Sequence, residues 1–371
     1  MKAVILAGGF GTRIRPLTHL NPKPMLPLVN KPFMHNFISW LKSHGIKDII
    51  LSTGYLPKVF EDYFGDGSSL GIKLTYVTEE IPLGTCGAVK NVENYLDNES
   101  FMVFNGDVLS GINLTEMMRF HKDKKSDITI ALTPVEDPTS YGLVPLHPDG
   151  RVEKFLEKPS WDEITTNLIN AGTYIIERKL LDLVPPKENY SFERGLFPNA
   201  LEIGYRIYGH VSNAYWLDLG TPEKYLQAHK DILNGNVSFD FPGEEIYENI
   251  YIGKSSSYSK ESLLSGPIII GENSVIEKGA VINPLTVIGN NCHIASGSRI
   301  SGSVIFDGCK VGRECIIKDS ILSYNVEVGN KVIIDGVSVI GDNSIIEEGN
   351  IFKNGIKINI NSNIKKGQII F

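Results

Sequence analysis

The sequence predicts an α/β protein in which a mostly parallel sheet, with helices on both faces, is followed by a parallel β-helix. Three observations support this prediction. The chain has 371 residues, enough for two domains. Residues 1 to about 235 alternate strand-like and helix-like segments, which is the order of a Rossmann-like sheet. From Ile252 onward, apolar residues recur every six positions.

The elements of the first part follow from its hydrophobic pattern. Apolar, β-compatible runs predict strands, and apolar residues at helical spacing predict helices. Proline in the first turn supports the helix that starts at Pro57. The expected strands cover residues 2–7, 48–52, 73–78, 100–105 and 127–132, and the expected helices cover residues 33–44, 57–64, 85–95, 114–124 and 222–234.

The second part is a hexapeptide repeat. The period holds from Ile252 to Ile300; we expect the register to slip by one at Val311, return at Ile317, slip again at Val328 and run on to Ile370. A period of six fits neither a helix nor a flat strand. It fits a β-helix in which each of the three sides of a coil is one hexapeptide and one apolar residue of each hexapeptide points inward. About 18 residues per coil give roughly six to seven coils. We therefore expect an α/β domain at 1–235, a linker at 236–250 and a β-helix at 251–371.

Composition narrows the class of protein. Hydrophobic residues make up 42% and charged residues 21%, as in an ordinary globular chain. No apolar run approaches the ~18 residues of a membrane helix, and the N-terminus reads as a strand rather than a secretory signal, so we expect a cytoplasmic protein. The four cysteines form no C-x-x-C pair and are expected to be free thiols. A net charge of −7 argues against nucleic-acid binding but leaves a phosphorylated small substrate open.

A glycine-rich loop follows the first strand. The segment Gly8–Arg13 reads GGFGTR, and glycines at a strand end let backbone N–H groups approach a polyphosphate. The loop is neither a dinucleotide fingerprint nor a P-loop. Lys23 follows between two prolines, which would hold its stem rigid; standing alone, it would be interpreted as a solvated loop charge.

Together these segments resemble the sugar-1-phosphate nucleotidyltransferases, also called nucleoside-diphosphate-sugar pyrophosphorylases. The family signature G-G-x-G-T-R-x-x-P-L-T, followed by x-P-K-P-M, is matched by Gly8–Thr18 and Pro22–Met25. The resemblance continues through residues 82–87, 105–107, 155–159, 170–172 and 216–223, and is nearest to the mannose-1-phosphate guanylyltransferases. Resemblance to known hexapeptide-repeat proteins implies a left-handed β-helix.

The resemblance implies that an NTP and a sugar 1-phosphate react to give an NDP-sugar and pyrophosphate. Arg13 and Lys23 would be the catalytic cations, with Arg13 on the α-phosphate and departing pyrophosphate, and Lys23 between the α-phosphate and the sugar phosphate. The nucleotide-binding positions implied are Leu6, Gly8, Gly9, Gly11, Thr12, Arg13, Glu79, Gly84 and Thr85.

Two carboxylates are candidates for holding Mg²⁺. Asp107 follows an apolar strand and so lies at the carboxyl edge of the sheet, where ligands bind in open α/β folds, and Asp218 sits in an apolar W-L-D-L-G stretch. Mg²⁺ usually takes one or two carboxylates plus phosphate oxygens and water. Taken alone, each aspartate would be interpreted as a turn or helix cap. The family pattern places both on the metal.

The sugar and base pockets are also inferred from the resemblance. The sugar-phosphate-binding positions implied are Gly142, Glu157, Lys158 and Asn170. Guanine presents two adjacent donors that a carboxylate can accept as a fork, and by resemblance Glu79 stands at the base-recognition position, which favours GTP. The resemblance to the mannose-1-phosphate guanylyltransferases implies mannose 1-phosphate as the second substrate. A solvated Glu79, with the base held by backbone around residues 6–8 and Gly84, stays open.

Other functions remain possible on the sequence. One is a thymidylyl- or uridylyltransferase acting on glucose 1-phosphate. A second is an acyltransferase in the β-helix, with His293, its single histidine, as the candidate base. A third is a non-catalytic regulatory paralogue, although the phosphate cations and both metal carboxylates are present. The β-helix is expected to mediate self-association or regulation, and we expect the protein to be a homo-oligomer.

Overall fold

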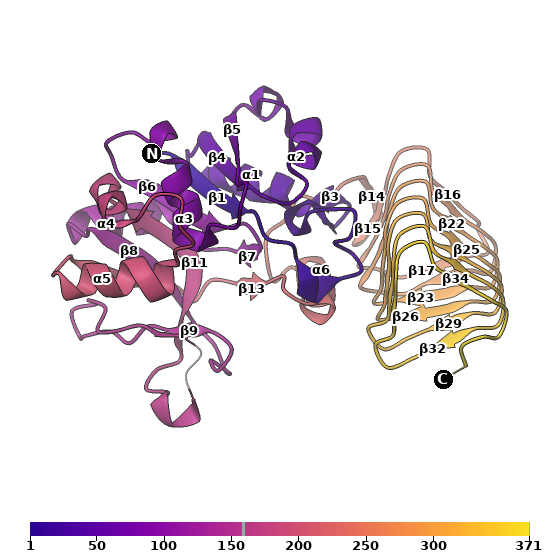
Figure 1. Cartoon of the computed structure of the whole chain (residues 1–371). Coiled ribbons are helices and arrows are strands. Elements are labelled where there is room, and N and C mark those ends of the chain that lie inside the picture. Colours follow the sequence, from indigo (N-terminus) through magenta and orange to yellow (C-terminus); the bar gives the residue numbers. More distant parts are fainter. Residues whose placement is uncertain (158–159, 371) are drawn as a thin grey trace. The chain divides into compact units, whose positions relative to one another are not determined.

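A computed structural model describes residues 1–157 and 160–370 (Figure 1). The chain forms two compact units. One contains residues 1–10 and 37–216; the other contains residues 11–36 and the chain from Leu217 onward. The domain boundaries expected near residues 235 and 251 stay a prediction. Residues 11–36, which follow the first strand and its two glycines, belong to the same compact unit as the C-terminal part.

The sheet of the first unit is parallel in one half. The order is β6-β1-β4-β5, and every neighbouring pair in it is parallel. The carboxyl ends of these strands therefore share one edge. Gly8, Glu79 and Asp107 all follow strands at this edge. The bounds are β1 (Ala3–Ala7), β4 (Asp48–Thr53), β5 (Lys73–Thr78) and β6 (Phe101–Asn105).

The other half of the sheet is organised around β11 (Leu168–Ile176). This strand lies antiparallel between β6 and β8 (Ile128–Pro134), and its register shifts between Asn170 and Tyr174. The strand expected at 127–132 thus joins the sheet through β11 rather than by pairing with β6. The remaining strands are β12 (Ile207–Val211), which pairs parallel to β8, and β9 (Gly142–Leu143), which pairs antiparallel to β10 (Leu156–Glu157) and to β11.

The helices lie close to their expected positions. The helix expected at 85–95 ends at Asn91 and continues as a separate 3₁₀ turn, Glu93–Tyr95. A π-helix, Phe192–Leu196, leads into α5. The α-helices are α1 (Phe33–Ser43), α2 (Pro57–Phe64), α3 (Gly84–Asn91), α4 (Leu114–Asp123), α5 (Phe197–Glu202) and α6 (Pro222–Leu233). Within the described residues, no helix is both long enough and apolar enough to cross a membrane.

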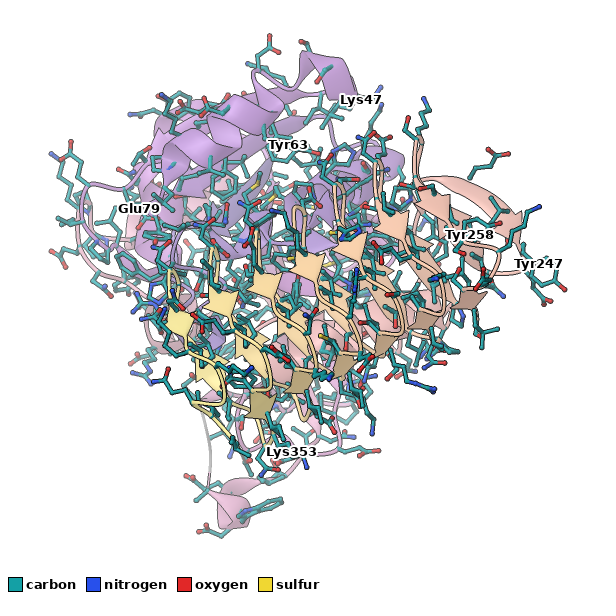
Figure 2. The ribbon with its side chains drawn as sticks, turned by 90° about the vertical axis from the view of Figure 1, so that its right-hand side faces the viewer. Lys47, Tyr63, Glu79, Tyr247, Tyr258 and Lys353 are labelled. Atoms are coloured by element: carbon teal, nitrogen blue, oxygen red, sulfur yellow. The ribbon has the colours of Figure 1, made fainter. Side chains whose placement is uncertain are left out.

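The C-terminal repeat forms a parallel β-helix with three sheets (Figures 1 and 2). The first sheet comprises β14 (Glu244–Tyr247), β15 (Ile250–Ile252), β18 (Ile268–Ile270), β21 (Thr286–Ile288), β24 (Val304–Ile305), β27 (Ile321–Leu322), β30 (Val339–Ile340) and β33 (Lys357–Ile358). The second comprises β16 (Ser257–Tyr258), β19 (Val275–Ile276), β22 (His293–Ile294), β25 (Lys310–Val311), β28 (Glu327–Val328), β31 (Ile345–Ile346) and β34 (Asn363–Ile364). The third comprises β17 (Leu263–Leu264), β20 (Val281–Ile282), β23 (Arg299–Ser301), β26 (Ile316–Lys318), β29 (Ile333–Ile334) and β32 (Ile351–Phe352). The left-handed sense stays a prediction.

The one-residue slips of the repeat expected at Val311 and Val328 are confirmed, and the spacing of six resumes at Ile317 as expected. The core positions run from Ile300 to Ile305 and from Ile317 to Leu322, so two successive coils are each one residue short. Both deletions fall at the corner between the third and first sheets. In the first of these coils the corner is turned by Ser301, Gly302 and Ser303, and Gly302 has φ 57°, a left-handed conformation that glycine adopts readily.

The expected inward-facing residues are exposed at the two ends of the stack of coils. Tyr258, in the first coil, is 47% exposed, because only a following coil packs against it; Figure 2 shows it at that end. Ile370 is 62% exposed, and Ile369 packs against the core in its place. The interior between these ends is a continuous aliphatic core that also contains the free thiols of Cys292, Cys309 and Cys315.

Candidate functional site

Glu79 is held against the glycine loop at the carboxyl edge of the sheet. Its Oε1 accepts a hydrogen bond from Ser52 Oγ at 3.2 Å, and its Oε2 accepts one from Leu83 N at 3.1 Å. A Cβ atom added to Gly8 would lie 2.8 Å from Glu79 Oε1, so only glycine leaves room for the carboxylate there. Glu79 is therefore a half-buried, oriented carboxylate rather than a solvated strand-end charge.

The first turn of α3 is fixed by a segment that the sequence did not single out. Gly84 has φ 69°, and a Cβ atom on it would lie 2.9 Å from Tyr190 O. Thr85 Oγ1 accepts a hydrogen bond from Phe192 N at 3.1 Å, and Cys86 N donates to Tyr190 O at 2.9 Å. Burial raises the pKa of the Cys86 thiol far above its usual range, which makes this cysteine unreactive.

Asp107 follows β6 at the same edge. The glycine before it, Gly106, donates from its N to Leu6 O at 2.9 Å, and a Cβ atom on Gly106 would lie 2.6 Å from that oxygen. The close approach ties the Asp107 turn to the end of β1, where the glycine loop begins. Asp107 therefore follows a residue that contacts Leu6, two positions before Gly8 in the chain.

Two of the expected sugar-pocket residues pair across neighbouring strands. Glu157 lies opposite Gly142 in the β9–β10 pair, and a Cβ atom on Gly142 would lie 2.9 Å from Glu157 Oε2. Lys158, which we expected beside them, lies outside the described residues. The third residue, Asn170, belongs to a separate polar cluster.

That cluster contains a glutamate missed by the sequence reasoning. Asn170 Nδ2 donates to Tyr174 Oη at 2.8 Å and to Glu193 Oε1 at 3.3 Å, and Tyr174 Oη donates to the same oxygen at 3.2 Å. Burial, followed by the negative charge of Glu193, raises the pKa of Tyr174, so its hydroxyl remains a donor. The one local signal for Glu193 is Ser191, which caps the π-helix by accepting from Glu193 N and Arg194 N.

In the second unit, Arg13 and Asp218 converge on Gly220. A Cβ atom on Gly220 would lie 2.6 Å from Asp218 Oδ2 and 3.0 Å from Arg13 Nη2. Lys224, on the first turn of α6, donates from Nζ to Asp218 Oδ1. The sequence reasoning missed Lys224. The carboxylate of Asp218 thus lies beside two cationic side chains.

Lys23 is packed beneath the glycine loop. Gly11 has φ 59°, and a Cβ atom on it would lie 3.2 Å from Lys23 Cβ and 3.0 Å from Thr18 Cγ2. Thr18 Oγ1 donates to Gly11 O at 2.7 Å. Lys23 is only 8% exposed, so the interpretation as a solvated loop charge is wrong. Thr12, by contrast, is exposed at the start of a short 3₁₀ turn.

The candidate residues are therefore divided between the units. Leu6, Gly8, Gly9, Glu79, Gly84, Thr85, Asp107, Gly142, Glu157 and Asn170 belong to the first, and Gly11, Thr12, Arg13, Lys23 and Asp218 belong to the second. The described residues contain no cluster of three or more His, Cys, Asp or Glu side chains able to hold a metal.

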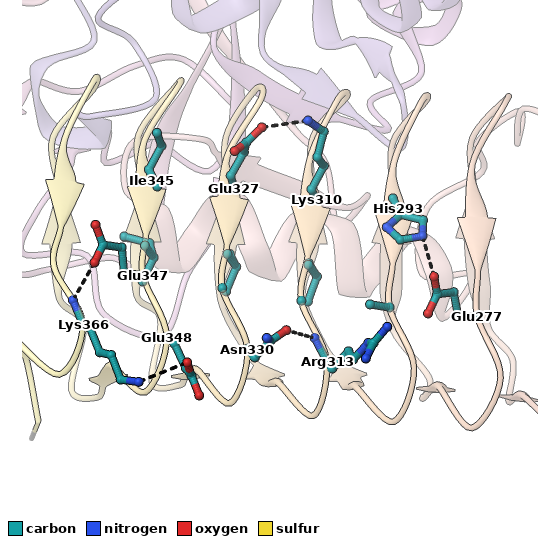
Figure 3. A pocket seen from close by; sticks show the side chains of 16 residues that line it. Glu277, His293, Lys310, Arg313, Glu327, Asn330, Ile345, Glu347, Glu348 and Lys366 are labelled. Carbon is teal, nitrogen blue, oxygen red and sulfur yellow. Dashed lines mark hydrogen bonds and ion pairs between the residues drawn. The ribbon is translucent and has the colours of Figure 1, made fainter.

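A shallow groove of about 600 Å³ crosses the second sheet of the β-helix (Figure 3). His293 Nε2 contacts Glu277 Oε1 at 2.9 Å, and Lys310 Nζ contacts Glu327 Oε1 at 2.7 Å. These pairs, with the Lys366–Glu348 pair, link successive coils. Stacking of the coils accounts for this charge pattern without a ligand.

Comparison with known proteins identifies the family. Residues 2–235 match the family profile "Nucleotidyl transferase", and residues 264–370 match "GMPPB C-terminal domain". A curated mannose-1-phosphate guanylyltransferase from Mycobacterium tuberculosis is 41% identical over 85% of this chain and 82% of its own length. A UTP–glucose-1-phosphate uridylyltransferase from Synechocystis is 32% identical over 87% of each chain. The crystal structure of HddC from Yersinia pseudotuberculosis complexed with GMP-PN is 32% identical, has a TM-score of 0.53, and covers 61% of this chain and 97% of its own. The signature loop, the strand-end carboxylates and these matches agree, and the chain belongs to the nucleotidyl transferase family of enzymes.

Proposed function

We propose that the chain transfers a guanylyl group from GTP to mannose 1-phosphate, giving GDP-mannose and pyrophosphate. The observation that carries the guanine assignment is the oriented, half-buried carboxylate of Glu79 beside Gly8. Each carboxylate oxygen has further lone-pair capacity after its bond to Ser52 or Leu83. Guanine N1–H and N2–H₂ can donate to such a fork, whereas adenine would place its N1 lone pair against it. The guanylyltransferase relative and the GMP-PN complex of HddC support the same nucleotide.

The loop and its cations would position and neutralise the phosphates. In the proposed reaction a phosphate oxygen of the sugar 1-phosphate attacks the α-phosphorus of GTP, and the bond from the α-phosphorus to the oxygen of the departing pyrophosphate breaks in line. Backbone N–H groups of Gly9, Gly11 and Thr12 would approach the phosphates. Arg13 would stabilise the α-phosphate and the pyrophosphate, and Lys23 would bridge the α-phosphate and the incoming phosphate. Such catalysis relies on positioning and charge stabilisation rather than on a covalent intermediate.

We propose that Asp107 and Asp218 hold Mg²⁺. Carboxylate oxygens are the hard ligands that Mg²⁺ takes in proteins, and the ion usually completes its shell with phosphate oxygens and water. When bound, Mg²⁺ would supply charge neutralisation and a template for the triphosphate. Lys224, paired with Asp218 in this structure, would balance that carboxylate in the absence of the ion.

Sugar 1-phosphate recognition is assigned to the Gly142–Glu157 pair, Lys158 and Asn170. The bare backbone of Gly142 allows close approach of a sugar ring, and Glu157 can accept from sugar hydroxyls. Asn170 already accepts from Gly172 N at 3.0 Å and donates twice, so it would act mainly through the Tyr174–Glu193 cluster.

We further propose that the protein is a homo-oligomer and that it is cytoplasmic. Four buried, free thiols are in keeping with the reducing environment of the cytoplasm.

The second candidate is uridylyl or thymidylyl transfer to glucose 1-phosphate, supported by the uridylyltransferase relative. Product analysis decides between them. The purified protein is incubated with GTP, ATP, UTP or dTTP and with mannose or glucose 1-phosphate, and NDP-sugar and pyrophosphate are quantified. GDP-mannose should form fastest. A higher kcat/KM with UTP or dTTP would overturn the guanine assignment, and no product with any pair would overturn the proposed transferase activity.

A further inference from the structure

We propose that Tyr225 of α6 is a positioning residue for Lys23, holding the lysine segment through a hydrogen bond that is itself fixed by the β-helix. The proposal rests on the proposed role of Lys23 in phosphoryl transfer. All the residues concerned belong to the second compact unit.

The segment that carries Lys23 is held at its far end. Lys23–Met25 form a 3₁₀ turn, and Pro27–Leu28 pair with Lys31–Pro32 in a short hairpin. The Tyr225 hydroxyl donates to Pro27 O, four residues after Lys23. Pro24 and Pro27 have a fixed φ, so the four residues after Lys23 have fewer free dihedral angles with which to absorb a displacement at Pro27.

The hairpin turn stores backbone strain that its surroundings must maintain. Val29 and Asn30 have φ values of 54° and 62°, as in a type I′ turn, and a β-branched residue such as Val is a true outlier there. Val29 is fully buried. Asn30 Nδ2 donates to Ile288 O of β21 at 2.7 Å, which anchors the turn to the first sheet of the β-helix. Strain of this kind persists where the packing over-determines the conformation, often at functional sites.

Tyr225 is fixed on its other side by the same sheet. Its ring is 1% exposed and packs edge-on against His229, with centroids 4.8 Å apart, and against Phe306, 6.2 Å away. Phe306 packs against Tyr324 of the next coil at 5.0 Å. Burial lowers the pKa of His229 to about 3, so its ring stays neutral within this cluster. The phenol therefore has little rotational freedom and presents its hydroxyl to Pro27 in one orientation.

The outer face of the first sheet of the β-helix is covered, as expected if the hairpin of residues 27–32 and α6 pack in this unit. Its outward row is aliphatic and completely or almost completely buried, whereas the outward residues Leu263 and Ile316 of the third sheet are exposed. Lys230 of α6 adds an ion pair to Asp319 in the same unit, and Figure 1 shows α6 beside the β-helix. The buried row consists of Ile269, Val287, Val304, Ile321 and Val339.

The test is Tyr225→Phe, which removes the hydroxyl and keeps the ring. Small misplacement of a charged group costs much of its effect in the transition state, so kcat should fall about tenfold while both KM values stay within about twofold. The matched control is Tyr76→Phe, since Tyr76 Oη donates to a backbone carbonyl, Gly65 O, at 2.7 Å in the first unit. Tyr76→Phe removes the same kind of hydroxyl-to-carbonyl bond away from Lys23 and should keep wild-type kcat.

A double-mutant cycle separates positioning from general destabilisation. In a Lys23→Ala background, Tyr225→Phe should lower kcat no further, because the group that it positions is gone. An equal kcat loss with and without Lys23, or a wild-type kcat for Tyr225→Phe, would overturn the proposal. Wild-type turnover in Lys23→Ala alone would instead refute the role of Lys23.

A second variant keeps the proposal testable if Tyr225→Phe fails to fold. Asn30→Gly removes the anchor to Ile288 O while keeping a residue that tolerates φ 62°. It should lower kcat several-fold and share the dependence on Lys23, and no effect of Asn30→Gly would count against the proposal. All variants are assayed with the NTP and sugar phosphate that the wild type uses best, so a wrong guanine or mannose assignment leaves the test valid.

Discussion

Replacing Glu79 by Gln changes the proposed base-recognition group with little change of shape. The carboxylate accepts from Ser52 Oγ and Leu83 N. A glutamine can keep the bond from Leu83 with its one oxygen, and the Ser52 hydroxyl can turn to accept from the new amide. We therefore expect Glu79→Gln to fold normally, and the change to be confined to the two acceptor positions offered to the base.

The expected loss follows from counting donors and acceptors. Guanine brings two donors, and the glutamine opposes one of them with a donor of its own. A hydrogen bond to a charged group contributes about 1.5–3 kcal/mol, which is roughly a ten- to hundredfold loss of kcat/KM for GTP. The kcat/KM for ATP should change little, so the ratio of kcat/KM for GTP to that for ATP should fall by the same factor.

The assay is steady-state pyrophosphate release with GTP, ATP, UTP and dTTP for the wild type and the variant. Glu80→Gln is the matched control, because it removes the same charge at the neighbouring, exposed position. If Glu80→Gln narrowed the nucleotide preference as much as Glu79→Gln, the effect would be one of general charge and the fork would be refuted. A wild-type preference for UTP or dTTP would refute it directly.

Three further predictions concern the metal, the sugar phosphate and the β-helix. Chelation should abolish pyrophosphate release, and Asp107→Asn should reduce it by orders of magnitude; full activity in excess chelator would remove Mg²⁺ from the proposal. Lys158→Ala should raise the KM for sugar 1-phosphate about tenfold with a smaller change for NTP, and the reverse pattern would reassign the lysine. Burial raises the pKa of Asp342 although Ser323 donates to it, so the protein loses stability as the pH rises from the unfolded-state pKa through the folded-state pKa of this carboxyl group. Asp342→Asn should therefore raise Tm at pH 7.5, and the gain should shrink as the pH falls toward 4; a lower Tm at pH 7.5 would contradict the sign.

Much of the fold could be predicted because its signals are local. Helix α2 begins and ends at the expected residues, since apolar spacing and an N-terminal proline lie within its own sequence. The antiparallel insertion of β11 between β6 and β8 was not predicted, because it depends on pairings between segments far apart in the chain. The slips at Val311 and Val328 were predicted, but the inward residues that follow each shortened corner, Ile305 and Leu322, were not named. Val304, Ile305 and Phe306 are consecutive apolar residues, so the sequence does not reveal which one faces inward.

The candidate site was predicted only in part, because motifs are local in the sequence whereas contacts between distant segments are not. Motif residues such as Glu79 and Lys23 could be named from the sequence, although their proposed roles stay predictions. Their environments could not be derived. Glu193 reaches Asn170 across 23 positions, and Tyr225 reaches Pro27 across 198. No local pattern encodes such contacts, which depend on the packed structure.

The discontinuity of the second compact unit has a consequence for biosynthesis. Residues 11–36 leave the ribosome early, but the elements that they pack against follow Trp216, about 180 residues later. At roughly 5–20 residues per second, the segment waits on the order of 10–40 s before α6 and the first coils exist. Throughout that interval the future Val29–Asn30 turn lacks the partners that hold its strained conformation. The loop proposed to carry catalysis therefore reaches its final form only after α6 and the first coils have been synthesised, and a chain that stops before α6 would contain the signature sequence without its native conformation.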